Sequence, residues 1–361
     1  MSKYYTLDRI KKVDAQFKIL LGGRNIGKSY ATKHDVLKEC YQTGKEFIYL
    51  RRWDRDIKTQ NVLNYFADVD VSGITDGKYT NIDVFHGIIY FHNVDEDGKK
   101  TDKLTLGYAH ALNLNERYKS QIFPKVIRII YEEFITDEGY LPDECNKLQN
   151  YVSTIFRERS GVVYMVGNTI SKLCPYFNEW RLEKVTKMKT HEIALFENST
   201  EVLTPDGNIV ILVKIAVEMC GAQSVLSKMA FGDSANMIVK NTWQSKTVAK
   251  LDDKVREDSE EIYTLFVYCD NLCFRLSLMI YNNMAFWYVT PQTKAIKNEE
   301  QTRIISDKPS INPLHTNNFT ALSDKEKVAF GLIKQNKIFY CSNSCGTDFQ
   351  QVLKKYHVLF I

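Results

Sequence analysis

Short apolar runs alternate with stretches of helical periodicity in the first half of the chain. The runs predict buried strands at 17–21, 46–51, 126–131 and 162–166, and the periodic segments predict helices at about 28–41, 62–66 and 143–156. Three further strands, at 82–85, 88–92 and 104–109, are joined by short turns and predict an antiparallel insertion. Alternation of strands and helices is typical of a mostly parallel sheet with helices on its faces, so the pattern predicts an α/β fold.

The pattern changes in the second half. Strands are predicted at 190–196 and 208–216, followed by a mixed helical stretch to about residue 243. The run 244–260 is rich in Lys, Asp and Glu and predicts a linker. Beyond it, three consecutive strands are predicted at 262–268, 274–280 and 284–289, then a loop at 291–318, and two helices at 324–335 and 347–355 that flank a strand at 338–341.

We therefore predict three parts along the chain. Residues 1–205 form an α/β domain, residues 206–255 form a connecting region, and residues 256–361 form a smaller α/β domain. The length of 361 residues agrees with two or three domains. A hydrophobic content of 44% with 19 Phe and 21 Tyr excludes a disordered chain, because these residues are sufficient to form the hydrophobic cores of folded domains.

The net charge and the length of the apolar runs limit the possible contacts of the chain with nucleic acid and with membranes. The net charge of +4 comes from 48 basic and 44 acidic side chains, so any contact with nucleic acid must come from a local patch. The longest apolar runs are too short to span a bilayer, and the first residues lack the apolar core of a signal peptide. We expect no membrane partner and a cytoplasmic location.

The eight cysteines are scattered, which in a long cytosolic chain predicts free thiols. Four of them lie in the last third as two C-x3-C pairs and provide an alternative, a zinc site. The usual knuckle spacing is C-x2-C, and the sequence leaves the alternative open. These four are Cys269, Cys273, Cys341 and Cys345.

One segment carries the pattern G-x4-G-K-[ST] between a predicted strand and a predicted helix, where a phosphate-binding loop must lie. It consists of Gly22, Gly23, Arg24, Asn25, Ile26, Gly27, Lys28 and Ser29. The glycines let backbone amides surround a phosphate, and the helix N-terminus adds partial positive charge. Lys28 would contact the β- and γ-phosphates of ATP and Ser29 would bind Mg²⁺. A glycine turn that binds nothing is the alternative.

Two carboxylates follow the apolar run 126–131. Glu132 would hold the hydrated metal, and Glu133 would act as the general base on the attacking water. Asp is usual at the first of these positions, but one extra methylene still permits contact through water. The alternative is an acidic strand end that only faces solvent.

Polar residues also end two other predicted strands. Asn168 follows the run 162–166 and is a candidate sensor of the γ-phosphate, although an Asn that caps a loop is equally compatible. Arg51 and Arg52 end the run 46–51, near enough to hold a carboxylate such as Glu133 inactive.

Two arginines lie at the end of the helix 143–156. Arg157 or Arg159 could project into the site of a neighbouring subunit and stabilise the charge of phosphoryl transfer. Cations that favour a helix C-terminus are the alternative, and that explanation needs no partner subunit.

Together these residues resemble the DNA-packaging ATPases of small podoviruses of the phi29 type. The resemblance covers about the first half of the chain, in the family's order and at close to its spacing. The matching segments are Gly22 to Tyr30 and Ala31, Glu46 to Arg52, Glu132 to Ile135, Phe156, Arg157, Arg159, Asn168, and Pro175 to Phe177.

The resemblance implies a homomeric ring, a pentamer, that docks on the portal of an empty prohead in the host cytoplasm and translocates double-stranded DNA at the expense of ATP. It further implies an N-terminal ATPase domain of the additional-strand, conserved-glutamate class and a C-terminal domain similar to RNase H-like nucleases. Some relatives use a packaging RNA, and the sequence leaves that partner open.

The resemblance also implies roles for single residues. Glu133 takes the position of the catalytic glutamate, Arg157 that of an arginine finger acting in trans, and Arg51 that of the residue that restrains the glutamate. Lys119 takes the position of a pore-loop lysine, with Arg117 as a neighbouring candidate. A solvated loop lysine is the alternative for Lys119.

Other functions stay open at this stage. Cleavage by two metals needs several carboxylates at strand ends, but the predicted strands 274–280 and 284–289 contain none, so we expect no nuclease activity. A helicase or a filamentous-phage-type assembly ATPase would share the phosphate loop. A structural protein that binds a nucleotide without hydrolysing it would share it as well.

Overall fold

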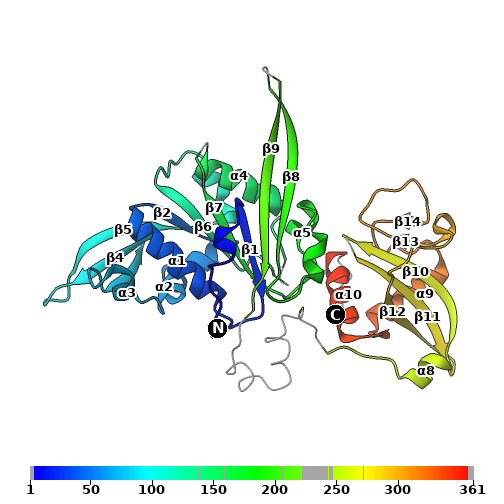
Figure 1. Cartoon of the computed structure of the whole chain (residues 1–361). Helices are drawn as coiled ribbons and strands as arrows, with labels where there is room; N and C mark the ends of the chain where they lie inside the picture. Colours follow the sequence, from blue (N-terminus) through cyan, green and yellow to red (C-terminus); the bar gives the residue numbers. More distant parts are fainter. Residues whose placement is uncertain are drawn as a thin grey trace. The chain divides into compact units, whose positions relative to one another are not determined.

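The structure is a computed structural model that describes residues 4–136, 139–157, 159–204, 207–221, 243, 247–270 and 272–356. The chain divides into two compact units. The first contains Met1–Thr169 and Pro175–Thr242, and the second contains Ile170–Cys174 and Trp243–Ile361. Figure 1 colours both units along the sequence.

Among the described residues, the first unit contains a nine-stranded mixed sheet in the order β3-β4-β5-β2-β6-β7-β1-β9-β8. Its strands are β1 (Phe17–Gly22), β2 (Glu46–Arg51), β3 (Asn81–Phe85), β4 (Ile88–Val94), β5 (Lys100–Ala111), β6 (Val126–Glu132), β7 (Val162–Asn168), β8 (Ile193–Thr204) and β9 (Gly207–Met219). The six strands from β5 to β9 in this order are parallel, and antiparallel pairs flank them at both edges. The predicted α/β class with a mostly parallel sheet is confirmed.

Helices cover both faces of this sheet, which explains the continuous apolar runs of its strands. The helices are α1 (Lys28–Thr43), α2 (Thr59–Phe66), α3 (Val71–Thr75), α4 (Glu144–Phe156) and α5 (Pro175–Glu179). On one face Leu20, Phe47 and Tyr49 pack with buried residues of α1, α2 and α3. α4 packs on β6 from the other face (Figure 1). All six residues of β1 are buried as a result.

The strand order brings three chain segments to one edge of the sheet. β7 lies between β1 and β6, and all three strands are parallel. Gly22 at the end of β1 pairs with Asn168 at the end of β7, and Glu132 at the end of β6 pairs with Val166. The carboxyl ends of parallel strands meet at the same edge, so residues 34 to 146 positions apart become neighbours there.

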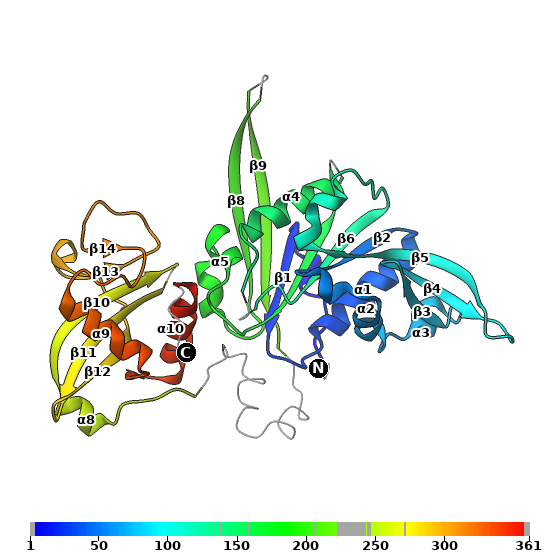
Figure 2. The ribbon, with the colours of Figure 1, turned by 180° about the vertical axis from the view of Figure 1, so that it is seen from behind.

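β8 and β9 form a long hairpin, visible from behind in Figure 2. The base of β9 pairs with β1 over residues 215–219. Residues 207–219 therefore belong to the first sheet, whereas the sequence assigns them to the connecting region 206–255. The helical stretch predicted between about 217 and 243 begins with residues 217–219, which are the end of β9, and most of the rest lies outside the described residues.

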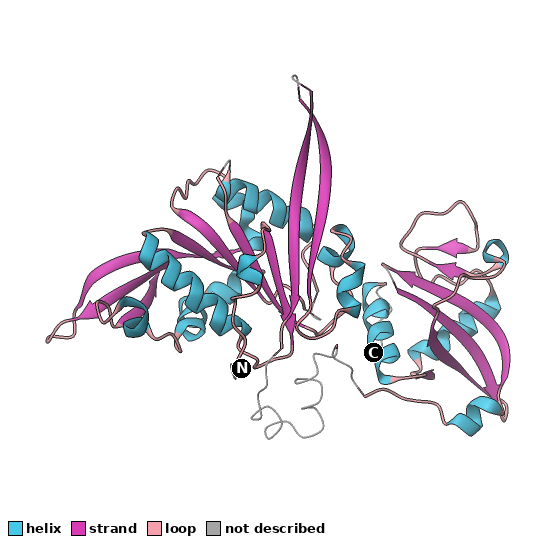
Figure 3. Ribbon diagram, in the orientation of Figure 1, coloured by secondary structure: helices cyan, strands magenta, loops and turns pink. Residues whose placement is uncertain are grey.

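The described part of the second unit contains a six-stranded sheet in the order β14-β13-β10-β11-β12-β15. Its strands are β10 (Glu260–Cys269), β11 (Leu272–Tyr281), β12 (Met284–Pro291), β13 (Ile304–Ile305), β14 (His315–Thr316) and β15 (Ile338–Tyr340), and its helices are α8 (Asp253–Glu257), α9 (Asp324–Lys334) and α10 (Asn343–Lys355). The antiparallel strands β10, β11 and β12 confirm the three predicted strands (Figure 3).

Two features of this unit differ from the predictions. The segment 291–318, predicted as a loop, contains β13 and β14, which are two residues long and too short to give a periodic pattern. The predicted linker 244–260 contains α8, which is capped by the Asp252 side chain. The core of the unit surrounds Trp287, whose buried indole nitrogen donates to the carbonyl of Ala329 at 2.7 Å.

All eight cysteines are free thiols. Among the described residues, no group of three or more His, Cys, Asp or Glu side chains is placed to hold a metal ion. The alternative of a zinc site at Cys269, Cys273, Cys341 and Cys345 is therefore not supported there. In the same described part, no helix has both the length and the apolar character needed to cross a bilayer.

The contact between β5 and β2 gives the first prediction. A Cβ atom added at Gly107 would lie 2.2 Å from the backbone oxygen of Phe47 on the paired strand. We expect Gly107→Ala to lower the free energy of unfolding by about 2 kcal/mol, because backbone cannot yield as a side chain can. Chemical denaturation followed by circular dichroism measures this change.

Gly331→Ala is the control, since a Cβ at this position in α9 meets no atom within 4 Å. It should leave stability unchanged or raise it by up to about 1 kcal/mol, the difference in helix propensity. Equal stability of the wild type and Gly107→Ala would contradict the close strand contact.

Candidate nucleotide-binding and catalytic site

The phosphate-binding loop lies between β1 and α1, as the sequence predicts. Gly27 precedes the first helical residue with φ of +93°, and Asn25 also has a positive φ of +61°. The loop exposes Arg24 and Asn25 and buries Ile26, whose carbonyl accepts from the amide of Tyr5 at 2.9 Å. The amides at the start of α1 have no acceptor within the helix and are suited to bind an anion.

Lys28 is buried at the centre of this loop. Its Nζ donates to the carbonyls of Gly22 at 3.2 Å and Gly23 at 2.6 Å, and to Oδ1 of Asn168 at 3.1 Å. Burial lowers the pKa of Lys28 to about 8, and the neighbouring Glu132 carboxylate acts in the opposite direction. An anion of high charge would supply the counter-charge that this ammonium group lacks.

The structure brings Ser29 and Glu132 into contact. The Ser29 hydroxyl donates to Oε2 of Glu132 at 3.2 Å, and the carboxylate is only 5% exposed. Burial raises the pKa of Glu132, while hydrogen bonds from Tyr65 and Ser29 act in the opposite direction. A hydroxyl beside a buried carboxylate is a suitable pair of oxygen ligands for Mg²⁺.

Tyr30, the residue after Ser29, is 43% exposed, and its ring stacks on that of His34.

Tyr65 is a site residue that the sequence analysis missed. Its hydroxyl donates to Oε1 of Glu132 at 2.8 Å, and its ring stacks on Tyr49 at 4.5 Å. Tyr65 lies on α2, far from Glu132 in sequence, and no motif marks it. Only the packing of α2 on the sheet brings the two residues together.

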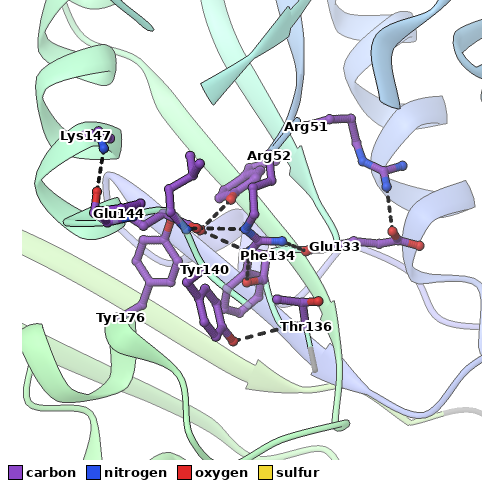
Figure 4. Close-up of polar contacts among 12 residues, drawn as sticks. Arg51, Arg52, Glu133, Phe134, Thr136, Tyr140, Glu144, Lys147 and Tyr176 are labelled. Atoms are coloured by element: carbon purple, nitrogen blue, oxygen red, sulfur yellow. Dashed lines mark hydrogen bonds and ion pairs between the residues drawn. The ribbon is translucent and has the colours of Figure 1, made fainter. Parts of the chain in front are cut away.

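Glu133 differs from Glu132 in both exposure and conformation. Its side chain is 64% exposed, and its backbone has a positive φ of +55°. Its Oε2 accepts from Nη2 of Arg51 at 2.6 Å (Figure 4). The proximity expected from the sequence is thus present, whereas the restraining role of Arg51 stays a prediction.

The two arginines after α4 have different surroundings. Arg157 is exposed, has a positive φ of +51°, and donates from Nη2 to the carbonyl of Gln121 at 3.4 Å. Arg159 donates to the carbonyls of Phe123 at 2.9 Å and Ile155 at 2.7 Å and also contacts that of Pro124. Its guanidinium therefore joins the end of α4 to the segment before β6.

Lys119 follows the 3-10 helix η3 (Leu112–Tyr118). Its side chain is 54% exposed and forms an ion pair with Glu116, three residues earlier, at 2.7 Å. An exposed pair of this kind contributes little to stability, so the side chain can exchange its partner at small cost.

Comparison with known proteins places the chain in a family. The model of the podovirus DNA encapsidation protein (Gp16) family matches residues 1–209, more than half of the chain. The chain belongs to this family. The Gp16 match includes the phosphate loop, both glutamates, the candidate sensor and both arginines of the site.

Individual relatives agree with the Gp16 assignment. The chain is 33% identical over 171 residues to the DNA packaging protein of Bacillus phage B103, covering 45% of this chain and 47% of that protein. It is 30% identical over 185 residues to the DNA packaging protein of Bacillus phage phi29, covering 49% of each. The matches thus span about half the length of these relatives.

A solved structure of the bacteriophage Phi-29 viral genome packaging motor assembly shows the same fold. The comparison covers 99% of both chains with a TM-score of 0.54 and 19% sequence identity. At this identity the likeness concerns the fold alone.

Lys28 provides the prediction for this site. Removal of its ammonium group by Lys28→Ala should weaken binding of ATP by about 10- to 100-fold, as expected for a hydrogen-bonded charge pair. Equilibrium titration with a fluorescent ATP analogue measures the dissociation constant. Lys38→Ala removes an exposed lysine from the same helix and should leave binding unchanged; equal losses in the two variants would contradict the assigned loop.

Proposed function

We propose that this chain is an ATP-hydrolysing motor that drives double-stranded DNA into a viral prohead. The main support for the proposal is a cluster of four side chains at one sheet edge: Lys28, Ser29, Glu132 and Asn168. This cluster occurs in a member of the DNA encapsidation family. Glu133 lies next to this cluster with an exposed carboxylate. Together these groups could bind a nucleotide, hold a metal ion and activate water.

The chemistry follows from the surroundings of each group. Lys28 and the amides at the start of α1 would bind the phosphates of ATP. Mg²⁺, held by Ser29 and Glu132, would neutralise charge on the phosphate oxygens. Glu133 is exposed enough to reach a water molecule and accept its proton, but only when its carboxylate leaves Arg51.

The strand order supports a specific class of ATPase. β7 lies between the phosphate-loop strand β1 and the acidic strand β6, as in ATPases with an additional strand and a catalytic glutamate. Asn168, at the end of β7, bonds to Lys28 at 3.1 Å and would sense whether the γ-phosphate is present. Release of the γ-phosphate would therefore alter the contact between Lys28 and Asn168 at the end of β7.

We propose a ring in which Arg157 completes the site of a neighbouring subunit. Arg157 is favoured over Arg159 because it is exposed, whereas Arg159 is bonded to three carbonyls of its own chain. A positive φ in a non-glycine residue costs energy and recurs at functional positions. The proposal includes a pentameric ring, the portal of the prohead as its partner, and assembly in the host cytoplasm.

DNA would be held through its phosphates by a few exposed cations. Lys119 is a candidate because its exposed pairing with Glu116 is easily replaced by a DNA phosphate. A packaging RNA enters this proposal as an optional partner, to be tested by packaging with and without RNA.

We further propose that the second unit is an RNase H-like domain without nuclease activity. Its antiparallel β10, β11 and β12 continue into the parallel neighbour β13, a mixed order compatible with that fold. Asp270 and Asp307 both accept from Nζ of Lys355, at 2.9 and 3.2 Å. One lysine therefore bridges the two carboxylates and offsets part of their negative charge, which disfavours their use as metal ligands.

Glu133→Gln tests the motor activity. The amide cannot accept a proton, so the rate of ATP hydrolysis should fall by about 10²- to 10⁴-fold while ATP still binds. Packaging of double-stranded DNA into purified proheads should be lost in parallel. Glu96→Gln, in an exposed turn between β4 and β5, is the control and should keep both activities.

Two outcomes would overturn the proposal. Negligible hydrolysis by the wild type that Glu133→Gln leaves unchanged would indicate a nucleotide-binding structural protein. Stimulation of hydrolysis by single strands but not by double-stranded DNA with proheads would indicate a helicase or another assembly ATPase.

The trans role of Arg157 predicts rescue in mixed rings. Arg157→Ala subunits keep a complete phosphate loop, and Lys28→Ala subunits keep a complete arginine, so a mixture should regain part of the ATPase rate. A mixture of Lys28→Ala with Glu133→Gln is the control, because neither subunit then has a working site of its own. Absence of rescue at every ratio would exclude a site shared between subunits.

A further inference from the structure

Arg51 and Arg52, at the end of β2, contact different parts of the same catalytic residue. Arg51 bonds to the Glu133 carboxylate, whereas Arg52 is buried and bonds to the backbone (Figure 4). Nη1 of Arg52 donates to the carbonyl of Glu133 at 3.1 Å, and its Nη2 donates to the carbonyl of Phe134 at 2.6 Å. One guanidinium therefore holds two consecutive peptide oxygens.

The same guanidinium forms a bidentate ion pair with Glu144, the first residue of α4. Nε of Arg52 lies 2.8 Å from Oε2 and Nη2 lies 3.0 Å from Oε1 of this carboxylate. Glu144 is 2% exposed and also accepts from the hydroxyls of Tyr131 and Tyr176 and from the amide of Leu141, each at 2.8 Å. A buried pair with this many partners has a single stable geometry.

The peptide held by Arg52 has an unfavourable conformation. Glu133 has a φ of +55°, which costs energy in a residue with a side chain and persists only when its surroundings enforce it. Arg52 binds the carbonyls on one side. On the other, the Phe134 ring packs against Gly167 of β7, where an added Cβ would lie 2.7 Å from Cε1 of the ring.

The Arg52–Glu144 pair also closes the loop that leaves the catalytic residue. The chain departs at Glu133 and returns with Tyr140, whose ring centre lies 4.9 Å from the guanidinium carbon of Arg52. Glu144 then begins α4 at the same point. Both ends of the loop are thereby attached to a single side chain, that of the residue that follows β2.

We propose that Arg52 and Glu144 are positioning residues for the reaction, because they fix the backbone of Glu133 while Arg51 controls its side chain. With the peptide fixed, the carboxylate moves between Arg51 and water by side-chain rotation alone. This inference rests on the proposed function, since it gives Glu133 the role of general base.

Arg52→Lys tests the inference. A lysine keeps the charge but donates from a single atom, so it cannot span the Glu144 carboxylate and two carbonyls at once. We expect kcat for ATP hydrolysis to fall by about 10- to 100-fold, the cost of a displacement of about 1 Å in a catalytic group. The equilibrium dissociation constant for ATP should change less than about twofold, because the phosphate loop keeps its contacts.

A double variant separates positioning from general damage. In a Glu133→Gln background, Arg52→Lys should cause no further loss of kcat, because the group that it positions is already inactive. Hydrogen exchange of the amides in residues 133–136 and 139–143 should become faster in Arg52→Lys alone, which shows the loosened loop without any measurement of activity.

Arg128→Lys is the matched control. Arg128 lies on β6 and makes a bidentate pair with Glu39, at 2.9 and 2.6 Å, at the end of the strand away from Glu133. Arg128→Lys should lower the thermal stability of the protein without changing kcat for ATP hydrolysis. Glu144→Gln is a second variant, which keeps the shape of the side chain and one acceptor oxygen and should reproduce the loss of kcat.

The possible failures are distinguishable. If Glu133→Gln leaves hydrolysis unchanged, the proposed function is wrong. If Glu133→Gln abolishes hydrolysis but Arg52→Lys and Glu144→Gln leave kcat unchanged, the positioning role alone is wrong. The same holds if the losses of kcat caused by these two variants add to the loss caused by Glu133→Gln. Failure of both variants to fold, or an equal loss of kcat in Arg128→Lys, would assign the pair to stability and overturn the inference as well.

Discussion

The parallel pairing of β7 with both β1 and β6 is the constraint on which the site depends. It places Gly22 opposite Asn168 and holds Glu132 one strand away, so that the ends of three strands form one surface. Helices on both faces bury all of β1 and most residues of β6 and β7, and a buried parallel sheet tolerates no shift of register. The contacts of Lys28 with Asn168 and of Ser29 with Glu132 follow from this geometry.

Two neighbouring carboxylates acquire opposite properties at this edge. Glu132 is buried and bonded to Ser29 and Tyr65, which suits a group that holds a metal ion in place. Glu133 is exposed and contacts Arg51, which suits a group that must move. The backbone turns at Glu133 with a positive φ, and Arg52 donates to the carbonyl of this residue. Two identical side chains, consecutive in sequence, therefore have different burial and different partners.

Much of the fold could be predicted from sequence because it is encoded locally. The apolar run 126–131 and the G-x4-G-K-[ST] pattern are continuous in the chain, and both lie where they were expected. Six of the thirteen predicted strands are one or two residues longer in the structure. The short strands β13 and β14 could not be predicted, because two residues carry no period. The pairing of β13 with β10 is a long-range contact, and β14 pairs in turn with β13.

The sequence by itself determined the identity of the phosphate loop, the acidic strand end and the arginines after α4, since each is a local pattern of residue types. Tertiary structure alone decided that Tyr65 bonds to Glu132, that Arg52 and Glu144 form a buried pair, and that β9 joins the first sheet. Those contacts join segments 67 to about 200 residues apart. The packing of helices on the sheet and the pairing of distant strands bring such segments together, and no local pattern records these contacts.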